Sequence, residues 1–178
     1  MSKNNVKPFE LLAEYERLSL KHKVDVLTEK VRDQWSGVGF KVGDTYYAIA
    51  IEKIVEVLIL SETTKIPGIA KWVLGLGNIR GNLLPIIDFK SYLTNQPIKI
   101  TAHTRMVVIQ QIAGQVGLVV DEVFGQKHFV NKQKIKNNKK ENELKYSELA
   151  FEDKGIVWNV LEDEKLINDP LFQNAAAV

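Results

Sequence analysis

Side chains that could carry out chemistry are few and widely spaced in this 178-residue sequence. The three imidazoles, His22, His103 and His128, have no second histidine or carboxylate at the spacing of a metal site or a catalytic pair. The acidic clusters at 121–122 and 162–164 lack the oxygen-rich loop and turn glycine of a calcium site. We therefore expect no metal, no cofactor and exposed histidines. His22 as a phosphoacceptor is the alternative, although no kinase motif surrounds it.

Three glycines, Gly75, Gly77 and Gly81, form a G-x-G-x-x-x-G pattern similar to that of a phosphate-binding loop. Such a loop needs a helix directly after the glycines, because the helix N-terminus holds the phosphate. Here an apolar run with Pro85 follows, which disfavours a dinucleotide site. The pattern instead favours strand, turn and strand, with Gly81-Asn82 in a tight type I′ or II′ turn. Because Pro85 has no amide hydrogen, we predict that the second strand is an edge strand or ends there.

Arg80 stands beside this turn and carries a rigid guanidinium fork with five donors. Asn78 has a side-chain amide that can tie the turn backbone together. Glu56, in the apolar run 54–60, needs water or a cation, because a buried unpaired carboxylate costs several kcal/mol. A solvent-facing and a partner-facing Glu56 remain competing interpretations. We expect the Asn78 to Gly81 corner to be presented outward for another protein.

The remaining elements are mainly short strands. Six apolar or alternating segments, with several turns between them, follow from the periodicity. An amphipathic stripe at 8–34 predicts a helix, which we expect to dock on its own domain rather than on a partner. Strands are predicted at 38–42, 45–51, 54–60, 106–110, 116–123 and 156–161, one or two helical turns at 69–74, a short helix or turn at 88–93, an exposed loop at 94–103, and a terminal helix starting at 162–167.

Composition narrows the class of protein. The chain is long enough for one domain or for two small subdomains that share a core. It has no cysteine, which fits a reducing cytoplasm, and a net charge of only +2, which favours neither a nucleic acid nor an anionic membrane as partner. No apolar run approaches the roughly 18 residues of a membrane span. The lysine-rich segment 127–145 contains no arginine or tryptophan, which favours a flexible connection over a nucleic-acid site.

Three ordered segments resemble the CheW-like domains, which are adaptors that couple chemoreceptors to a CheA-type histidine kinase. Residues 75–89 are similar to the family pattern G-x-x-N-L-R-G-x-x-x-P-V-x-D-L, residues 47–57 to Y-A-I-x-I followed by V-x-E-V, and residues 116–123 to V-G-L-V-V-D-x-V. One part of the sequence differs from the family pattern. The family has a glycine-rich stretch before its closing strand, whereas this chain has only Gly155 after Tyr146. The N-terminal extension and the segment that follows it resemble most the adaptors of type IV pilus, twitching-motility systems.

The resemblance implies a fold. It is a mainly β architecture of two intertwined, five-stranded SH3-like barrels with an N-terminal amphipathic helix and a short C-terminal helix. The implied divisions are a helical extension at 1–35, a CheW-like domain at 36–168 with subdomains at about 36–95 and 105–161, and a tail at 169–178.

The resemblance also implies a function. The chain would be a non-catalytic cytoplasmic adaptor, recruited to receptor arrays at the membrane, including arrays at a cell pole. Its partners would be the regulatory domain of a CheA-like kinase and the cytoplasmic tip of a methyl-accepting chemoreceptor. The implied kinase contacts are Glu56, Asn78, Arg80 and Gly81; the implied receptor groove contains Ile54, Gly75, Met106, Gly117 and Gln126, the last standing where the family often has an aliphatic residue.

Two other classes of protein compete with this interpretation. One is a small β-barrel nucleic-acid binder that uses the segment 127–145, whose binding would weaken steeply as salt rises. The other is a hydrolase or phosphatase whose site is assembled only by folding.

Overall fold

A computed structural model describes residues 34–111, 114–136 and 144–175 of the chain. The helix expected at 8–34 falls outside these residues, apart from Gln34, which begins the first strand. None of the described helices is long and apolar enough to cross a membrane. The elements are β1 (Gln34–Val42), β2 (Thr45–Ala50), η1 (Ile51–Lys53), β3 (Ile54–Ile59), β4 (Val73–Ile79), β5 (Asn82–Asp88), α2 (Phe89–Thr94), β6 (Arg105–Gln111), β7 (Gly114–Val120), β8 (Glu122–Val130), η2 (Asn131–Gln133), β9 (Lys134–Lys136), β10 (Leu149–Asp153), β11 (Ile156–Val160), α3 (Asp163–Ile167) and α4 (Pro170–Gln173).

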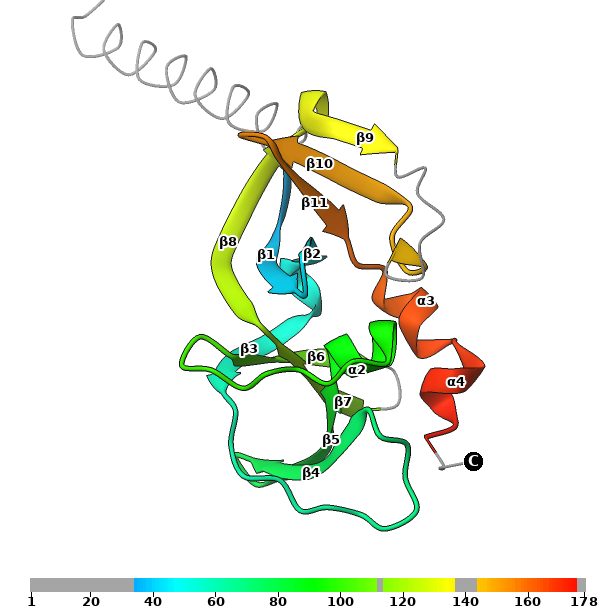
Figure 1. Ribbon diagram of the computed structural model, residues 1–178. Helices are drawn as coiled ribbons and strands as arrows, with labels where there is room; N and C mark the ends of the chain where they lie inside the picture. Colours follow the sequence, from blue (N-terminus) through cyan, green and yellow to red (C-terminus); the bar gives the residue numbers. More distant parts are fainter. Residues whose placement is uncertain (1–33, 112–113, 137–143, 176–178) are drawn as a thin grey trace, which may run out of the picture. The chain divides into compact units, whose positions relative to one another are not determined.

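The strands form two sheets (Figure 1). The five-stranded sheet has the order β3-β6-β7-β5-β4, and the six-stranded sheet has the order β8-β1-β2-β11-β10-β9. Each sheet contains one parallel pair, β5 with β7 and β11 with β2, and these pairs join strands that are distant in the sequence. Each sheet therefore takes strands from both expected segments, 36–95 and 105–161. The mainly β prediction with two small sheets is confirmed, although one sheet has six described strands rather than five.

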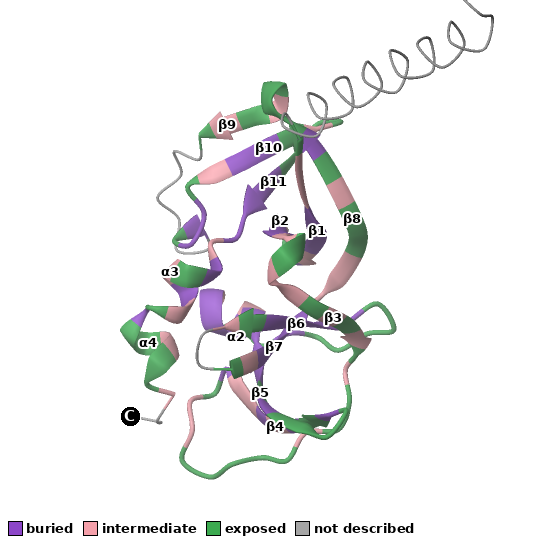
Figure 2. Cartoon of the chain, turned by 180° about the vertical axis from the view of Figure 1, so that it is seen from behind, coloured by how far each residue is buried: buried purple, intermediate pink, exposed green. Residues whose placement is uncertain are grey.

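Alternation along the strands builds the interior (Figure 2). In β6, Met106 and Val108 point into a core enclosed by the five-stranded sheet, whereas Val107 and Ile109 point to the opposite face. That opposite face packs against Phe40 and its neighbours from β1 and β2, so it joins the two sheets. Since each buried Val or Ile side chain contributes about 1.5–3 kcal/mol, a shift of one residue in register would expose both cores.

Asp88 positions the helix that follows β5. Its carboxylate is buried, where Oδ1 accepts a hydrogen bond from the Ser91 N–H at 2.8 Å and Oδ2 accepts one from the Ile98 N–H at 2.9 Å. The first bond caps the N-terminus of α2, and the second holds the loop that leaves it. The cap places Phe89 and Tyr92 of α2 in the core between the sheets.

The prediction that Pro85 marks an edge strand is wrong, because β5 lies between β7 and β4. Pro85 pairs with Leu76, whose backbone N–H and C=O both bond to Thr64 on the other side, at 2.9 and 2.8 Å. The missing amide hydrogen of Pro85 would therefore point away from β4, toward β7. The pairing with β7 begins only at Ile86, so the proline interrupts no hydrogen bond.

Two other predictions also fail. Residues 69–72 form no helix but a turn that leads directly into β4. The segment 127–145 is not a plain loop, because β8 continues to Val130 and Lys134–Lys136 forms β9. These segments form strands because β8 pairs with β1 and β9 pairs with β10. Their own apolar pattern is too weak to predict that pairing.

Candidate functional site

The predicted recognition residues Glu56, Asn78, Arg80 and Gly81 come together, and we call them the hairpin corner. Because Ile79 pairs with Asn82, the central turn residues are Arg80 and Gly81, not Gly81 and Asn82 as the sequence suggested. Their φ angles are 51° and 89°, both positive as a type I′ turn requires. A left-handed conformation costs an arginine about 1 kcal/mol. The Asn78 side chain helps to hold it, since Oδ1 accepts a hydrogen bond from the Gly81 N–H at 2.9 Å.

An ion pair joins this turn to a distant strand. The Nη2 atom of Arg80 lies 2.9 Å from Oε2 of Glu56 in β3. The arginine side chain is 78% exposed and that of the glutamate only 16%. Because β3 and β4 are the first and last strands of the five-stranded sheet, the pair connects its two edges. Glu56 thus has a cation, as the sequence required, and most of the guanidinium stays available to solvent.

Exposed apolar side chains lie on the strands that flank the ion pair. Leu83, the cross-strand partner of Asn78, is 68% exposed. Val55, Val57 and Ile59 are exposed on alternate positions of β3, next to the partly buried Glu56. An arginine with exposed apolar neighbours is typical of protein–protein interfaces, where its fork can bind a carboxylate with two hydrogen bonds.

The residues of the implied receptor groove are spread over both sheets and differ in burial. Met106 is fully buried in the core of the five-stranded sheet, and a Cβ added at Gly117 would lie 2.7 Å from its Sδ atom. A Cβ at Gly75 would lie 2.2 Å from the Thr64 carbonyl oxygen, so this glycine permits a close backbone approach. Ile54 is half-buried against the core between the sheets, and Gln126 is exposed on β8 in the other sheet. Alternation turns Met106 and Gly117 toward the core, and the receptor-groove assignment stays a prediction.

The other candidate groups remain apart. His103 is exposed in the loop before β6, and Nδ1 of the exposed His128 lies 2.8 Å from Oγ of Ser36. Within the described ranges, no cluster of three or more His, Cys, Asp or Glu residues could hold a metal ion. The glycines of the G-x-G-x-x-x-G pattern lie in the β4–β5 hairpin rather than before a helix. Of the lysine-rich segment, Lys127 lies over the Trp158 ring at 4.9 Å, and 137–143 fall outside the described residues.

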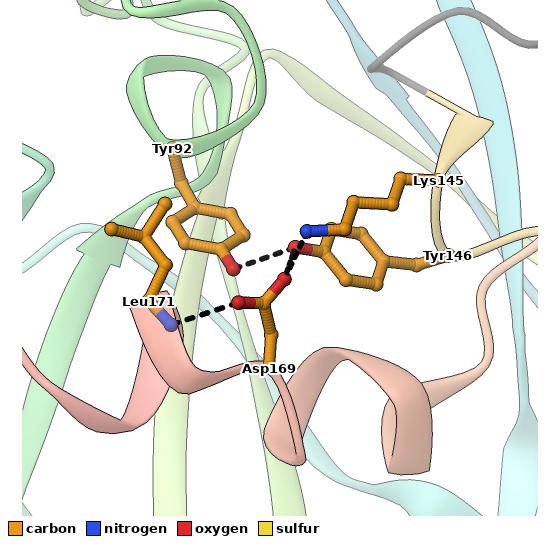
Figure 3. Close-up of polar contacts among 5 residues, drawn as sticks. All are labelled: Tyr92, Lys145, Tyr146, Asp169 and Leu171. Carbon is orange, nitrogen blue, oxygen red and sulfur yellow. Dashed lines mark hydrogen bonds and ion pairs between the residues drawn. The ribbon is translucent and has the colours of Figure 1, made fainter.

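A second polar cluster was not found from the sequence. We call Tyr92, Lys145, Tyr146 and Asp169 the Asp169 clasp (Figure 3). Oδ2 of Asp169 lies 2.5 Å from both Nζ of Lys145 and the hydroxyl of Tyr146, which lies 2.7 Å from the hydroxyl of Tyr92. Oδ1 accepts a hydrogen bond from the Leu171 N–H at 2.8 Å and so caps α4.

The environment of the clasp shifts its pKa values. Burial alone would raise the pKa of Asp169, but hydrogen bonds from Lys145, Tyr146 and the Leu171 N–H outweigh it and lower the pKa to about 2. Burial raises the pKa of Tyr92 to about 12, although its hydrogen bond with Tyr146 opposes part of the rise. Burial, followed by the hydrogen bond to Asp169, also raises the pKa of Tyr146 well above its usual range. At neutral pH the clasp therefore holds an ionised carboxylate and two neutral phenols.

One sequence signal could have located part of this cluster. Asp169-Pro170 is the pair that typically starts a helix, with an acid at the N-cap and a proline at the first helical position. It was instead assigned to a tail at 169–178. The tyrosines carry no local signal, because Tyr92 and Tyr146 are separated by 54 positions and meet only through tertiary packing.

Comparisons with known proteins agree on one family. The model of the CheW-like domain matches residues 36–171. Protein PilI of Pseudomonas aeruginosa is 33% identical over 123 residues, which cover 68% of this chain and 69% of PilI. Chemotaxis protein CheW of Bacillus subtilis is 28% identical over 96 residues, which cover 54% of this chain and 62% of that protein, slightly less than two thirds of its length.

A solved structure shares the fold. The scaffolding protein TtCheW from Thermoanaerobacter tengcongensis superposes with a TM-score of 0.64, over 71% of this chain and 88% of that chain. Its sequence identity to this chain is 19%, so the likeness is one of architecture.

Proposed function

This chain belongs to the family of CheW-like domains, and from that premise we propose that it is a non-catalytic adaptor that couples a chemoreceptor to a CheA-like histidine kinase. The similarity to PilI favours a chemosensory system that controls type IV pili and twitching motility. In this proposal the protein performs no bond chemistry. It holds two partners in one assembly and transmits a conformational bias between them, which requires contacts that differ between signalling states.

The hairpin corner is the observation that carries the proposal. Arg80 stands on a two-residue turn with 78% of its side chain exposed, while Glu56 holds one edge of the guanidinium. A rigid turn limits the entropy lost on binding, because the backbone is already ordered. Leu83, an exposed apolar residue three positions after Arg80, supplies surface that a partner can bury. We propose that this corner binds an acidic group on the regulatory domain of the kinase.

The receptor side of the proposal uses other residues. Ile54 and Gln126 keep accessible surface, so they remain candidate contacts for the cytoplasmic tip of a methyl-accepting chemoreceptor. Gly75, Met106 and Gly117 would act indirectly, by shaping the five-stranded sheet. We place the complex in the cytoplasm, at receptor arrays on the membrane.

A binding measurement with the kinase regulatory domain tests the proposal. The domain from a CheA-like kinase of the same organism is titrated onto the immobilised full chain, first wild type and then Arg80→Ala. We expect the wild type to bind and the variant to bind at least about tenfold more weakly, since an interface arginine that forms charge-assisted bonds often contributes 2 kcal/mol or more. Thermal unfolding should show that the variant is folded.

Lys136→Ala is the matched control, because it removes the same charge from an exposed position on β9 in the other sheet. It should bind as the wild type does. Absence of binding by the wild-type chain would contradict the adaptor function, whereas full binding by a folded Arg80→Ala protein would contradict only the role of the corner.

A further inference from the structure

The C-terminal segment Asp163 to Ala175 connects the two sheets. It leaves β11 in the six-stranded sheet and ends beside the residues that lead into β4 of the five-stranded sheet. There the ring of Phe172 stacks on that of Trp72, with centroids 5.8 Å apart and planes 12° apart. The Ala70 N–H donates a hydrogen bond to the Ala175 carbonyl oxygen at 2.8 Å. The segment therefore crosses from one sheet to the other.

The two helices of this segment are held differently. Leu166 of α3 is fully buried in the core between the sheets, so hydrophobic burial fixes this helix. No residue of α4 is buried, and Leu171 is exposed. A helix of four residues is not stable alone, because so short a segment does not repay the cost of nucleation. Contacts outside the helix must therefore decide whether α4 stays in place.

The Asp169 clasp is one of these contacts, and it brings together elements from both sides. Tyr92 comes from α2, which follows the five-stranded sheet's β5, and Lys145 and Tyr146 come from the residues just before β10 in the other sheet. Asp169 lies at the junction of α3 and α4, where one carboxylate both caps α4 and receives the Lys145 ammonium and the Tyr146 hydroxyl. Loss of its charge weakens the cap and the inter-sheet contact together.

A cavity lies under α4. Its volume is about 290 Å³, and residues from both sides of the contact line it. Phe172, Gln173 and Ala175 form one wall, and Trp72, Ile87 and Val116 lie among the residues opposite. Phe172 supplies the aromatic contacts of α4, with Trp72 and Tyr92, and the cavity beside them leaves the rest of this side of the helix incompletely packed.

We propose that α4 is a releasable latch, fastened by the Asp169 carboxylate, and that its release loosens the contact between the two sheets. The latch supplies the two arrangements that an adaptor needs in order to transmit a conformational bias. This regulatory consequence rests on the proposed function, whereas the latch itself is a property of the isolated chain.

Residue-specific hydrogen exchange of the full-length chain tests the latch. Asp169→Asn keeps a good N-cap residue but removes the charge that pairs with Lys145. We expect the exchange rates of the Ala70 and Gln173 amides, which bond to Ala175 and Asp169, to rise about tenfold or more. The amide of the buried Val108 in β6 should exchange at the wild-type rate. Equal acceleration at Val108, or no acceleration at Ala70 and Gln173, overturns the proposal.

A distance measurement tests the loosening between the sheets. The chain has no cysteine, so the substitutions Glu152→Cys on β10 and Leu83→Cys on β5 introduce the two sites at which spin labels attach. Both positions are exposed. Asp169→Asn should broaden the distribution of distances between these labels. Glu62→Gln, which removes the same charge from the exposed connection after β3, is the control and should leave the distribution unchanged. An unchanged distribution in Asp169→Asn shows that the latch does not control the sheets.

Kinase control is measured separately. In a reconstituted assembly of receptor, kinase and adaptor, Asp169→Asn should change the receptor's control of kinase activity by at least about twofold while the variant still binds the kinase regulatory domain. Unchanged control overturns the regulatory role. If the wild-type chain binds no kinase, the proposed function fails, and the exchange and distance results still decide whether the latch exists.

Discussion

Two ion pairs, Glu56–Arg80 and Lys145–Asp169, each join segments that are distant in the sequence, but they differ in what the surrounding chain leaves accessible. At the hairpin corner the guanidinium is 78% exposed. At the clasp the Asp169 side chain is 6% exposed and already has three donors, from Lys145, Tyr146 and the Leu171 backbone. The corner therefore presents a group that can bind a partner, whereas the clasp commits its central group to the fold.

The two ion pairs are expected to differ in what they contribute to the free energy of unfolding and to partner binding. At the hairpin corner water solvates the Arg80 guanidinium and weakens the ion pair, although Glu56 is only 16% exposed. A buried carboxylate with three donors stabilises the fold more, because its removal takes away the acceptor of the buried Tyr146 hydroxyl and the cap of α4 together. We therefore expect substitutions at the clasp to change the free energy of unfolding and substitutions at the corner to change binding.

Asp169→Ala should have the largest effect on stability. It removes the cap of α4 and the acceptor of Lys145 and Tyr146, so we expect a loss of about 2–3 kcal/mol in the free energy of unfolding, measured by urea denaturation. Glu62→Ala, an exposed acid in the connection after β3, should change it by less than about 0.5 kcal/mol. Equal effects from the two substitutions would remove the distinction between clasp and surface.

Titration of the clasp should lower the free energy of unfolding at both acid and alkaline pH. The folded pKa of Asp169 is about 2, below its ordinary 3.8, so its contribution is present above pH 3.8 and lost as the pH falls toward 2. This loss is about 2 kcal/mol. The folded pKa of Tyr92 is raised from 10.0 to about 12, so its contribution is present below pH 10 and lost as the pH rises toward 12. Denaturation midpoints at intervals from pH 2 to 12 measure both limbs, and Asp169→Asn should flatten the acid limb.

Arg80→Asn should have the smallest effect on stability. Asparagine adopts the left-handed conformation of turn residues more readily than arginine, and this gain offsets part of the cost of losing the ion pair with Glu56. We expect the free energy of unfolding to stay within about 1 kcal/mol of wild type, while binding to the kinase regulatory domain falls as in Arg80→Ala. A larger loss of stability would show that the corner also serves the fold, and the contrast with the clasp would be weaker.

Much of the architecture follows from local sequence. Alternation locates β1, β2, β3, β6 and β11, and the glycine and asparagine residues around Arg80 locate the β4–β5 hairpin. The side-chain amide of Asn78 was expected to tie the turn, and it does so through the Gly81 N–H. These features depend on neighbours within a few residues, so the chain reveals them without its fold.

The sequence by itself therefore determined the strand pattern, the outward arginine and the family resemblance. Only the tertiary structure decided that β5 is internal, that Met106 and Gly117 face a core, and that Asp169 meets Tyr92 and Tyr146. The physical reason is that sheet order and inter-element contacts are set by how apolar faces pack together, and many pairings are compatible with the same local periodicity.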